Sequence, residues 1–537
     1  MRLFLLDTEF AMNHQIIIDY INKTYGRDLR PSPMYNMIEI WRGWLEGTVK
    51  GFHTYWMKTD ITDKNKGKRK MRRHRTNMLL KGSEDWASIL MNEKTNIFID
   101  DEASQKFVMG DDIISGVFGD NDFWRCANEL VATSRWSGTG AFEVYVKDMD
   151  ISDSSNKLVS GSGIGINYLA ADQIIPISWD NTICRECAFA SERKMHGKDC
   201  YIVSTHILND DGNYDIEYFW LDEHGARIEK EGYGQVIHTG SPIPWFSIVR
   251  KSGVNIFDYD SPFGVSIISG SEDVLRGLDC AFDNFITDFK LGRKMVFMGS
   301  SMFSTDDDGD PLAPQDDDVQ LFINAGDTIA SNEHIYHEYN PQLRVVENAK
   351  GLQKMLDLFS FRIGLGTHRY TLEGIDHSGI KTATEWVGER QDMVQNAYKE
   401  MICIEKALKE IVRAILWIGK NVMKEDVNPD ALITIDADDS YIIDADTERK
   451  QWKEDVADGL RSKVEYRMHF YGETEEEAKK NCEPTFGELL EGFANGVVKA
   501  TELRRYLYKA ETEEQAKQAI EEIKAETPSL SDIYVEE

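Results

Sequence analysis

The spacing of apolar residues changes several times along the chain, and each change indicates a different kind of structure. To about residue 100 apolar residues such as Met78, Trp86 and Leu90 recur at roughly helical spacing, which predicts a helical start that ends at NIFIDD. From about 140 to 250 apolar and polar residues alternate, in segments such as AFEVYVKDM and YDIEYFWLD. This alternation predicts antiparallel strands, and DDGN at 210–213 predicts a hairpin turn between two of them.

Helical spacing returns after the SPFG turn. Ser269 and Glu272 have the spacing of a capping box, so we expect a helix to begin there. Its apolar stripe consists of Val274, Leu278, Phe282, Phe285 and Phe289. Lys290, Arg293 and Lys294 follow, where cations suit the negative end of the helix dipole.

The second half of the chain is predicted to be mostly helical. Residues 295–345 are expected to form short strands around the acidic loop TDDDGDPLAPQDDD, and another helix follows them. A glycine-rich loop then leads into the longest helix, about 381–423, and ALITIDADDSYIID predicts one more short strand. The residues from about 447 are helical in pattern and rich in Glu. Together these patterns predict an α+β fold with a long central helix.

Composition narrows the class of protein. The 537 residues suggest two to four domains, and 41% hydrophobic residues are typical of a folded globular chain. The formal net charge of −32 argues against a protein that wraps nucleic acid with its whole surface. It is compatible with nucleic acid that slides past a few cations. Seven cysteines in so long a chain favour a reducing compartment. The chain has no run of about 18 apolar residues, so we expect no membrane span, and the apolar run at its start is too short for an export signal.

The stretch GLGTHRYTLEGIDHSGIKTATEW, residues 364–386, resembles a phosphate-binding loop at first sight. A Walker A loop needs Gly and Lys side by side after a buried strand, whereas here Ile380 separates Gly379 from Lys381 and the preceding segment is helical. We therefore do not expect nucleotide binding. A flexible connector between helices fits the glycines, but it leaves unexplained why His368 and Arg369 lie in it.

Three other clusters have a possible chemical reading. Cys184, Cys187, His196 and Cys200 have zinc-like spacing, but CRECAFASE reads as a strand, whose residues three apart face opposite sides, so buried cysteines are favoured. The acidic residues of 306–318 do not match an EF-hand, because Gln315 stands where its last ligand, Glu, is required. A third group is more simply the polar edge of a strand than a metal site; it consists of Asp436, Asp438, Asp444 and Asp446.

The basic run KNKGKRKMRRHR at 64–75 is the strongest positive patch. It is expected either to touch nucleic acid or to be the solvated end of a helix that docks on acidic neighbours. The chain contains no G-x-S-x-G, H-E-x-x-H or G-x-G-x-x-G motif. We therefore expect neither an enzyme nor a bound cofactor or metal.

The order of segments in 261–423 is unusual: a helix, a small β excursion, a returning helix, a glycine-rich loop and a very long helix. With YNPQLRVVENAKGLQKMLDLFSFRIGLG and GIKTATEWVGERQDMVQNAYKEM, this order resembles the portal proteins of tailed bacteriophages. The branch found in phages and prophages of Gram-positive bacteria is the most similar. ANELVATSRWSGTGAFEVYV, IIPISWDN and SKVEYRMHFYGETEEEAKK also resemble that branch, and the resemblance extends from about residue 30 to 482.

The resemblance implies a portal fold and a name for each region. The wing would comprise 1–265, helical and then stranded, together with the long helix and strand of 381–470. The remaining regions would be the stem helices 266–293 and 346–365, the clip 294–345, the tunnel loop 366–380 and a helical crown 471–537.

The resemblance also implies a structural role at one capsid vertex of the virion, after assembly in the host cytoplasm. Such proteins form dodecameric rings through which double-stranded DNA is packaged and ejected, and which the major capsid protein, the terminase and a head-tail adaptor contact. The implied channel-lining cations are His368, Arg369 and Lys381 of the loop and Lys290, Arg293 and Lys294 of the stem. The loop hinges would be Gly364, Gly366, Gly374 and Gly379. An alternative from another class is an acidic scaffold or baseplate-like assembly protein that never contacts DNA.

Overall fold

The structure is a computed structural model of the chain, which forms two compact units, Met1–Ile442 and Ile443–Glu537. In the first unit it describes residues 12–58, 68–92, 95–111, 113–195, 197–292, 294–298, 304–305, 311–312, 322–324, 336–367, 369–371 and 383–436. In the second it describes residues 449, 452–456, 461–471 and 478–479. The boundary at 442 assigns residues 443–470 to the second unit, whereas the sequence analysis groups them with the long helix.

Two antiparallel sheets form the centre of the first unit, as the alternation in 140–250 predicts. The larger sheet contains β8 (Ile174–Asp180), β9 (Ile183–Met195), β10 (Lys198–Leu208), β11 (Tyr214–Asp222), β12 (Arg227–Ile228) and β13 (Val236–Ser241). The smaller has the order β14 (Phe246–Arg250), β4 (Thr139–Lys147), β7 (Gly163–Ala170). The DDGN turn is confirmed, because it joins β10 to β11 with Gly212 at φ 78°. Short elements between these strands are β5 (Asp150–Ile151), β6 (Leu158–Ser160) and the 3-10 turn Ala171–Gln173.

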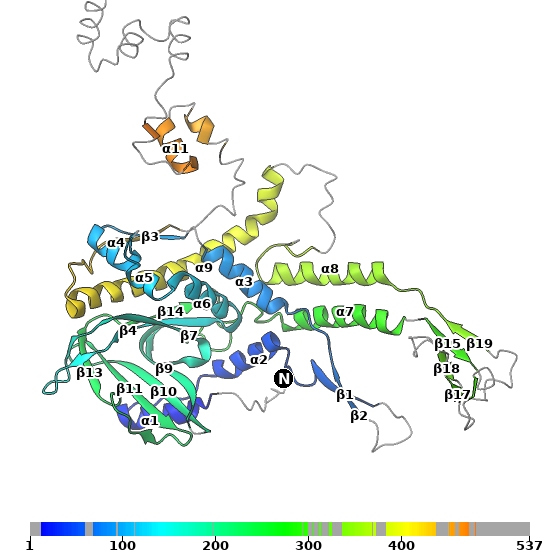
Figure 1. Cartoon of the computed structure of the whole chain (residues 1–537), viewed down its shortest axis with the longest axis horizontal. Coiled ribbons are helices and arrows are strands. Elements are labelled where there is room, and N and C mark those ends of the chain that lie inside the picture. The colour runs from blue at the N-terminus through cyan, green and yellow to red at the C-terminus, as the bar shows by residue number, and fades with distance from the viewer. Residues whose placement is uncertain are drawn as a thin grey trace, which may run out of the picture. The chain divides into compact units, whose positions relative to one another are not determined.

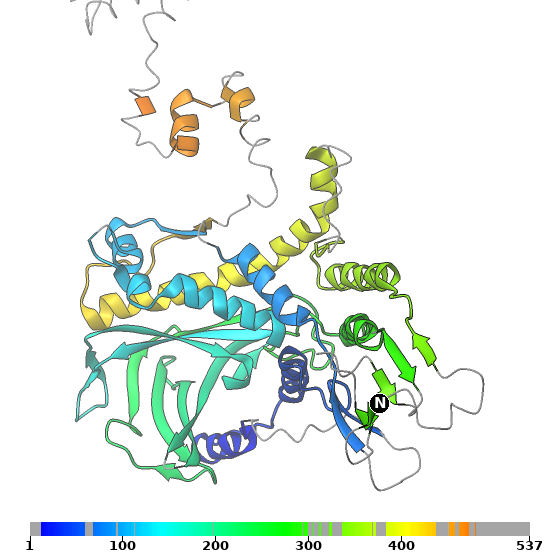
Figure 2. The ribbon, with the colours of Figure 1, turned by 45° about the vertical axis from the view of Figure 1, so that its right-hand side comes forward.

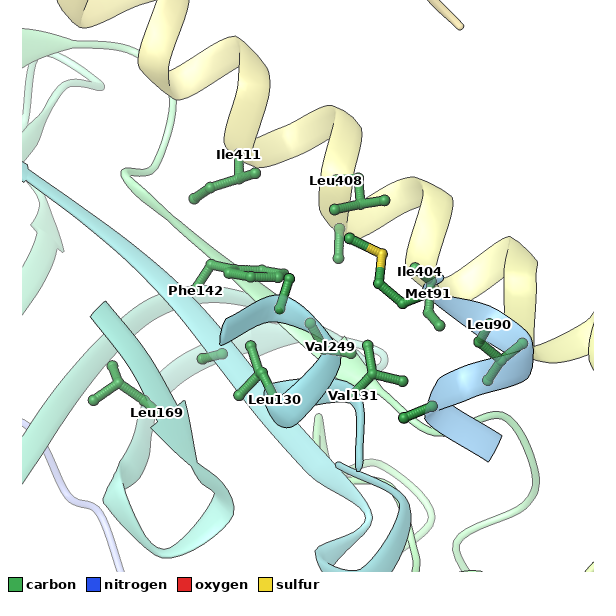
Figure 3. Close-up of a cluster of buried hydrophobic side chains, with 14 of the residues drawn as sticks. Leu90, Met91, Leu130, Val131, Phe142, Leu169, Val249, Ile404, Leu408 and Ile411 are labelled. Atoms are coloured by element: carbon green, nitrogen blue, oxygen red, sulfur yellow. The ribbon is translucent and has the colours of Figure 1, made fainter. Parts of the chain in front are cut away.

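Helices cover both outer sides of the sheets (Figures 1 and 2). The 36-residue α9 (Ala383–Ile418) lies over β14 and β4, beside α3 (Met78–Leu90) and α6 (Phe123–Ser137). Figure 3 shows Ile404, Leu408 and Ile411 of α9 facing Phe142 and Val249 of the smaller sheet. The long predicted helix is thus confirmed to residue 418, and its last turn, Gly419–Met423, has π-helical hydrogen bonding.

On the opposite side α1 (His14–Tyr25) packs against the larger sheet. Its apolar side chains Ile17, Ile18 and Ile21 are almost completely buried, together with Val203 and Phe219 of the strands. These positions are one, three and four residues apart, so they form one face of the helix. The arrangement leaves polar residues of α1 in solvent and closes the second hydrophobic cluster.

The prediction of a helical start is wrong at residues 54–58 and 68–72, and NIFIDD, where the predicted helical pattern ends, contains a strand that was not predicted. A hairpin is formed by β1 (Thr54–Lys58) and β2 (Lys68–Arg72), and β3 (Asn96–Ile99) pairs with β20 (Ile433–Asp436). Thr54, Tyr55 and Trp56 are residue types that favour strands, and distant pairing with β20 decides the conformation of β3. The remaining helices of this part are α2 (Met34–Glu46), α4 (Glu102–Met109) and α5 (Gly116–Asp120).

Two long helices extend from the β region, joined by short strands (Figure 1). They are α7 (Glu272–Leu291) and α8 (Val345–Arg362). The connecting strands are β15 (Met295–Met298), β16 (Ser304–Thr305), β17 (Pro311–Leu312), β18 (Phe322–Asn324) and β19 (Tyr336–Tyr339). The capping box of Ser269 and Glu272 is not formed: Ser271 is the residue before α7, and the Ser269 N–H donates to Ser266 in the preceding turn.

The second unit contains α11 (Lys463–Tyr471). The ring of Trp452 stacks on His469 at 4.5 Å, and the guanidinium of Arg461 lies 3.7 Å from the centre of the Trp452 ring. Most of the predicted crown, 471–537, lies outside the described residues.

Candidate functional site

The helix pair α7–α8 is the first part of the candidate site. Leu275 and Leu278 of α7 are buried, as are Leu352, Leu356 and Phe359 of α8. A side chain at Gly277 would already reach the Met355 sulfur at 3.4 Å, so the helices approach each other closely there. Of the apolar stripe predicted for α7 only Leu278 is buried, whereas Phe289 is 44% exposed and the other three residues are partly exposed. Leu275, which lies outside that stripe, is the second buried apolar residue of α7.

Arginines at the two ends of α8, Arg344 just before the helix and Arg362 at its last position, join α8 to α7. Arg344 donates to Asp288 through its backbone N–H at 3.0 Å and through its guanidinium at 2.9 Å. At the other end Arg362 donates to the Ser271 hydroxyl at 3.0 Å and to the Gly270 carbonyl at 2.8 Å. The helices are therefore antiparallel and fixed in register along their whole length.

The basic run docks on acidic residues of α7. Asp283 accepts from the His74 backbone N–H at 3.0 Å and lies 2.7 Å from His74 Nδ1, while Arg73 is 3.7 Å away. One turn earlier the buried Asp279 accepts from the N–H and hydroxyl of Thr76, at 2.8 and 2.9 Å. Of the two interpretations of 64–75, docking is the one that the described residues 68–75 support, although they form a strand and its extension rather than a helix.

The start of the glycine-rich loop is packed against two other helices. Trp86 Nε1 of α3 donates to the Ile363 carbonyl at 3.0 Å, and Asn396 Nδ2 of α9 donates to the Gly364 carbonyl at 3.1 Å. Gly364 and Gly366 have φ values of 86° and 77°, which other residues rarely adopt. Both glycines are therefore required for the turn out of α8, and their surroundings hold that turn in place.

Tyr370 anchors the loop a second time. Its hydroxyl donates to Asp85 at 2.7 Å, and its carbonyl accepts from Gln353 at 2.8 Å. The neighbouring Arg369 is exposed and has no ion pair among the described residues. His368, Gly374, Gly379 and Lys381, which the sequence analysis also assigns to this loop, lie outside the described residues.

The predicted cations at the end of α7 already have partners within the chain. Lys290 Nζ lies 3.1 Å from His74 Nε2, and Lys294 Nζ forms an ion pair with Glu338 of β19 at 2.6 Å. Arg293 lies outside the described residues. Exposed Arg369 is therefore the predicted channel cation that the described structure leaves most available.

Large apolar side chains are exposed on the same helix pair. Near the short strands Leu291 is 65% and Val346 60% exposed, and at the other end of α8 Phe361 is 54% exposed with Leu358 beside it at 43%. Leu358 and Phe361 are three residues apart and share one helix face. Patches of this kind on a folded chain are typical of surfaces that contact another protein.

The cysteine cluster does not converge on one point. Cys184 and Cys187 lie on β9, as predicted, but Cys187 pairs with His206 whereas Cys200 pairs with Arg193. Cys200 and His206 are six positions apart on β10, which separates the two pairs by roughly 20 Å, too far for one ion. His196, residues 306–310 and 313–318 of the acidic cluster, and Asp438, Asp444 and Asp446 lie outside the described residues; Asp436 ends β20.

Sequence reasoning missed the contacts that organise the site. Arg344 with Asp288, Arg362 with Ser271 and Tyr370 with Asp85 join residues 56, 91 and 285 positions apart. No local pattern indicates such pairing. Charge is the one feature of the sequence that could have indicated these contacts, because Arg344 and Arg362 are arginines at the two ends of a predicted helix in an acidic chain.

No family model and no curated protein matches this chain. Among solved structures it is similar to a chain described as the neck of a native GTA particle computed with C12 symmetry. That similarity has 11% sequence identity and a TM-score of 0.33, and covers 72% of this chain and 88% of the other. Within the described residues, no helix has the length and hydrophobicity needed to cross a membrane.

Proposed function

We propose that the chain is a structural, non-enzymatic portal protein, which assembles into a ring around a channel for double-stranded DNA. The observation that carries the proposal is the arrangement of the tied pair α7–α8. Short strands connect the two helices at one end, and at the other an anchored glycine turn leads toward the 36-residue α9. The segments that resemble portal proteins in sequence include this whole arrangement.

In this proposal the tied helices are the stem and the short strands the clip. The loop after Gly366 is the tunnel loop, the sheets with α1 to α6 and α9 form the wing, and the Glu-rich C-terminal part is the crown. A dodecameric ring would then expose different regions to the major capsid protein, the terminase and a head-tail adaptor. The exposed apolar face of the helix pair would lie between neighbouring subunits.

The charge of the chain supports a channel that binds DNA only weakly. A net charge of −32 repels phosphates, so DNA would remain centred rather than adsorbed. Arg369 is exposed next to an anchored residue, and a ring would repeat it once in each subunit. Brief, repeated contacts with a few cations permit sliding, because each phosphate contact contributes only a small, salt-dependent part of the affinity.

One observation favours the second candidate, an acidic assembly protein that never contacts DNA. Lys290 and Lys294 have partners within the chain and are therefore less available to phosphates.

Electron microscopy of the purified chain in end view separates the two candidates. The portal proposal expects closed rings with a central hole wide enough for duplex DNA. Filaments, or closed particles without a hole, would refute it and favour the assembly protein.

A further inference from the structure

A pocket beside the edge strand β14 has a composition unlike that of the chain as a whole. It has a volume of about 310 Å³ and lies between α9, β14 and the turn that joins β8 to β9. Its lining includes Arg185, Arg250, Lys406 and Arg413, with Ile183 and Ile248 among the apolar residues. Four cations around one pocket are unexpected in a protein with a net charge of −32. We refer to it as the edge pocket.

Two of these arginines have no carboxylate partner among the described residues. Arg250 Nε is fully buried and makes no hydrogen bond there, and burial lowers the pKa of its guanidinium. Arg413 is exposed on α9 and forms no ion pair with a described residue. The pocket's carboxylate, Glu410, is already engaged: it accepts from the Ser247 hydroxyl at 2.6 Å and lies 3.8 Å from Lys406. A buried guanidinium nitrogen without a hydrogen-bond partner is costly, and both arginines lack a carboxylate, so the pocket is complementary to an added anionic group.

The backbone of β14 offers further donors and acceptors. β14 is the outermost strand of its sheet, paired only with β4. The Trp245 carbonyl accepts from Val144, and Lys251 N–H donates to Gly138, so the odd-numbered residues point their backbone groups toward β4. By the alternation of an antiparallel ladder, Phe246, Ile248 and Arg250 direct theirs away from β4. For these three residues the described structure contains no other backbone partner.

We propose that the edge pocket binds an extended acidic segment of a partner protein, which adds as a strand to β14. The segment's carboxylates would meet Arg250 and Arg413, and its apolar side chains would lie against Ile183 and Ile248. The arginines of the pocket favour a ligand with a negative charge, and the unpaired backbone groups of β14 favour a ligand in the extended conformation.

Nucleic acid fits the same features less well. A phosphodiester backbone has no donors and acceptors that would match a strand edge, and the apolar residues of the lining would be left without a contact. The pocket is also small for a duplex. The inference is independent of the proposed portal function, because it uses only β14 and its neighbours.

The test measures binding of a fluorescein-labelled peptide of alternating Val and Glu to the full-length protein by fluorescence anisotropy. The proposal expects saturable binding at or below about 1 mM. The same peptide with Lys for Glu should not bind, and N-methylation of alternate amides should weaken binding about tenfold or more, since it removes one edge of strand pairing.

Variants of the protein place the ligand in the pocket. Arg413→Glu, an exposed change, and Arg250→Gln should each weaken peptide binding about tenfold. Arg193→Glu, an exposed arginine of β9 outside the pocket, should have no effect. Absence of peptide binding, equal binding by Arg413→Glu and the unchanged protein, or displacement of the peptide by inorganic phosphate or a short duplex DNA would each overturn the proposal.

Discussion

The hydroxyl of Tyr370 donates a hydrogen bond to the carboxylate of Asp85 at 2.7 Å, joining the loop after α8 to helix α3. Burial, and then the bond to Asp85, raise the pKa of Tyr370, so the hydroxyl keeps its proton. Together with the Asn396 and Gln353 contacts, this bond holds Gly364 and Tyr370 against the body of the protein. The exposed Arg369 is therefore the immediate neighbour of a residue, Tyr370, that is held in place.

Removing this hydroxyl should loosen the loop. Tyr370→Phe deletes a hydrogen bond to a charged group, and we expect the free energy of unfolding to fall by about 1–2 kcal/mol, because Lys81 still pairs with Asp85. Amide exchange in residues 365–371 should accelerate. Tyr398→Phe is the control, since Tyr398 is 55% exposed on α9. Equal stability and exchange in the two variants would contradict the anchoring role.

A buried ion pair joins α6 to α9. Arg135, completely buried, donates to Glu400, which also accepts from the Ser252 N–H at 3.0 Å and from its hydroxyl at 2.7 Å. Arg135→Met leaves the carboxylate without its main partner and should destabilise the fold by about 3–5 kcal/mol in denaturant titrations. The exposed pair of Arg125 and Glu129 provides the control, and Arg125→Met should cost less than about 1 kcal/mol.

The same pair predicts how stability depends on pH. Burial alone would raise the pKa of Glu400, but Arg135 and Lys251 outweigh it and lower the pKa. A lowered folded pKa means that this stabilisation is fully present above the unfolded value of about 4.3 and is lost as the pH falls through the folded pKa. Glu400→Gln should therefore be less stable at neutral pH and show a flatter decline on acidification. Parallel stability curves for the two proteins would contradict this.

How much of this the sequence could predict depends on the range of the interactions. The α7 stripe of Leu278 and Phe285, the alternation in β11 and the length of α9 were readable because each is a local period. The β1–β2 hairpin and β3 were missed, since the conformation of β3 depends on a strand more than 330 residues away. The Arg135–Glu400 pair and the helix ties have no local signal.

The candidate site shows the same division. The sequence pointed to Gly364 and Gly366, whose φ values are positive, but it did not show that Lys290 and Lys294 have partners in His74 and Glu338. The role of Arg369 in a channel stays a prediction. The sequence shows which residues carry a positive charge. Whether a charge remains available depends on which distant residue lies next to it.

The exposed apolar face of α8 should contribute to assembly. Leu358→Ser with Phe361→Ser should lower the free energy of unfolding of the monomer by no more than about 2 kcal/mol, because each residue already has about half of its surface in solvent. Sedimentation velocity should show fewer large species than for the unchanged chain. Phe98→Ser, at a residue 53% exposed on β3, is the control. Unaltered assembly would mean that this face of α8 does not lie at a subunit contact.

The last prediction concerns the loop cations and the proposed channel. Arg369→Glu, alone or with Lys381→Glu, should leave folding and ring assembly largely intact, because loop residues such as the exposed Arg369 contribute little to the core. Each subunit carries the change, so the charge of the ring of tunnel loops that we propose faces the DNA would be reversed.

Packaging or retention of DNA should therefore fall, and the salt dependence of any residual DNA association should lose about one unit of slope per phosphate contact. Arg193→Glu changes the net charge equally at an exposed position of β9 and should package normally. A ring-forming Arg369→Glu, Lys381→Glu double variant that packages and holds a full genome would show that these cations do not face DNA. The loop would then be a connector between α8 and α9, and the acidic assembly protein would be the better description of the chain.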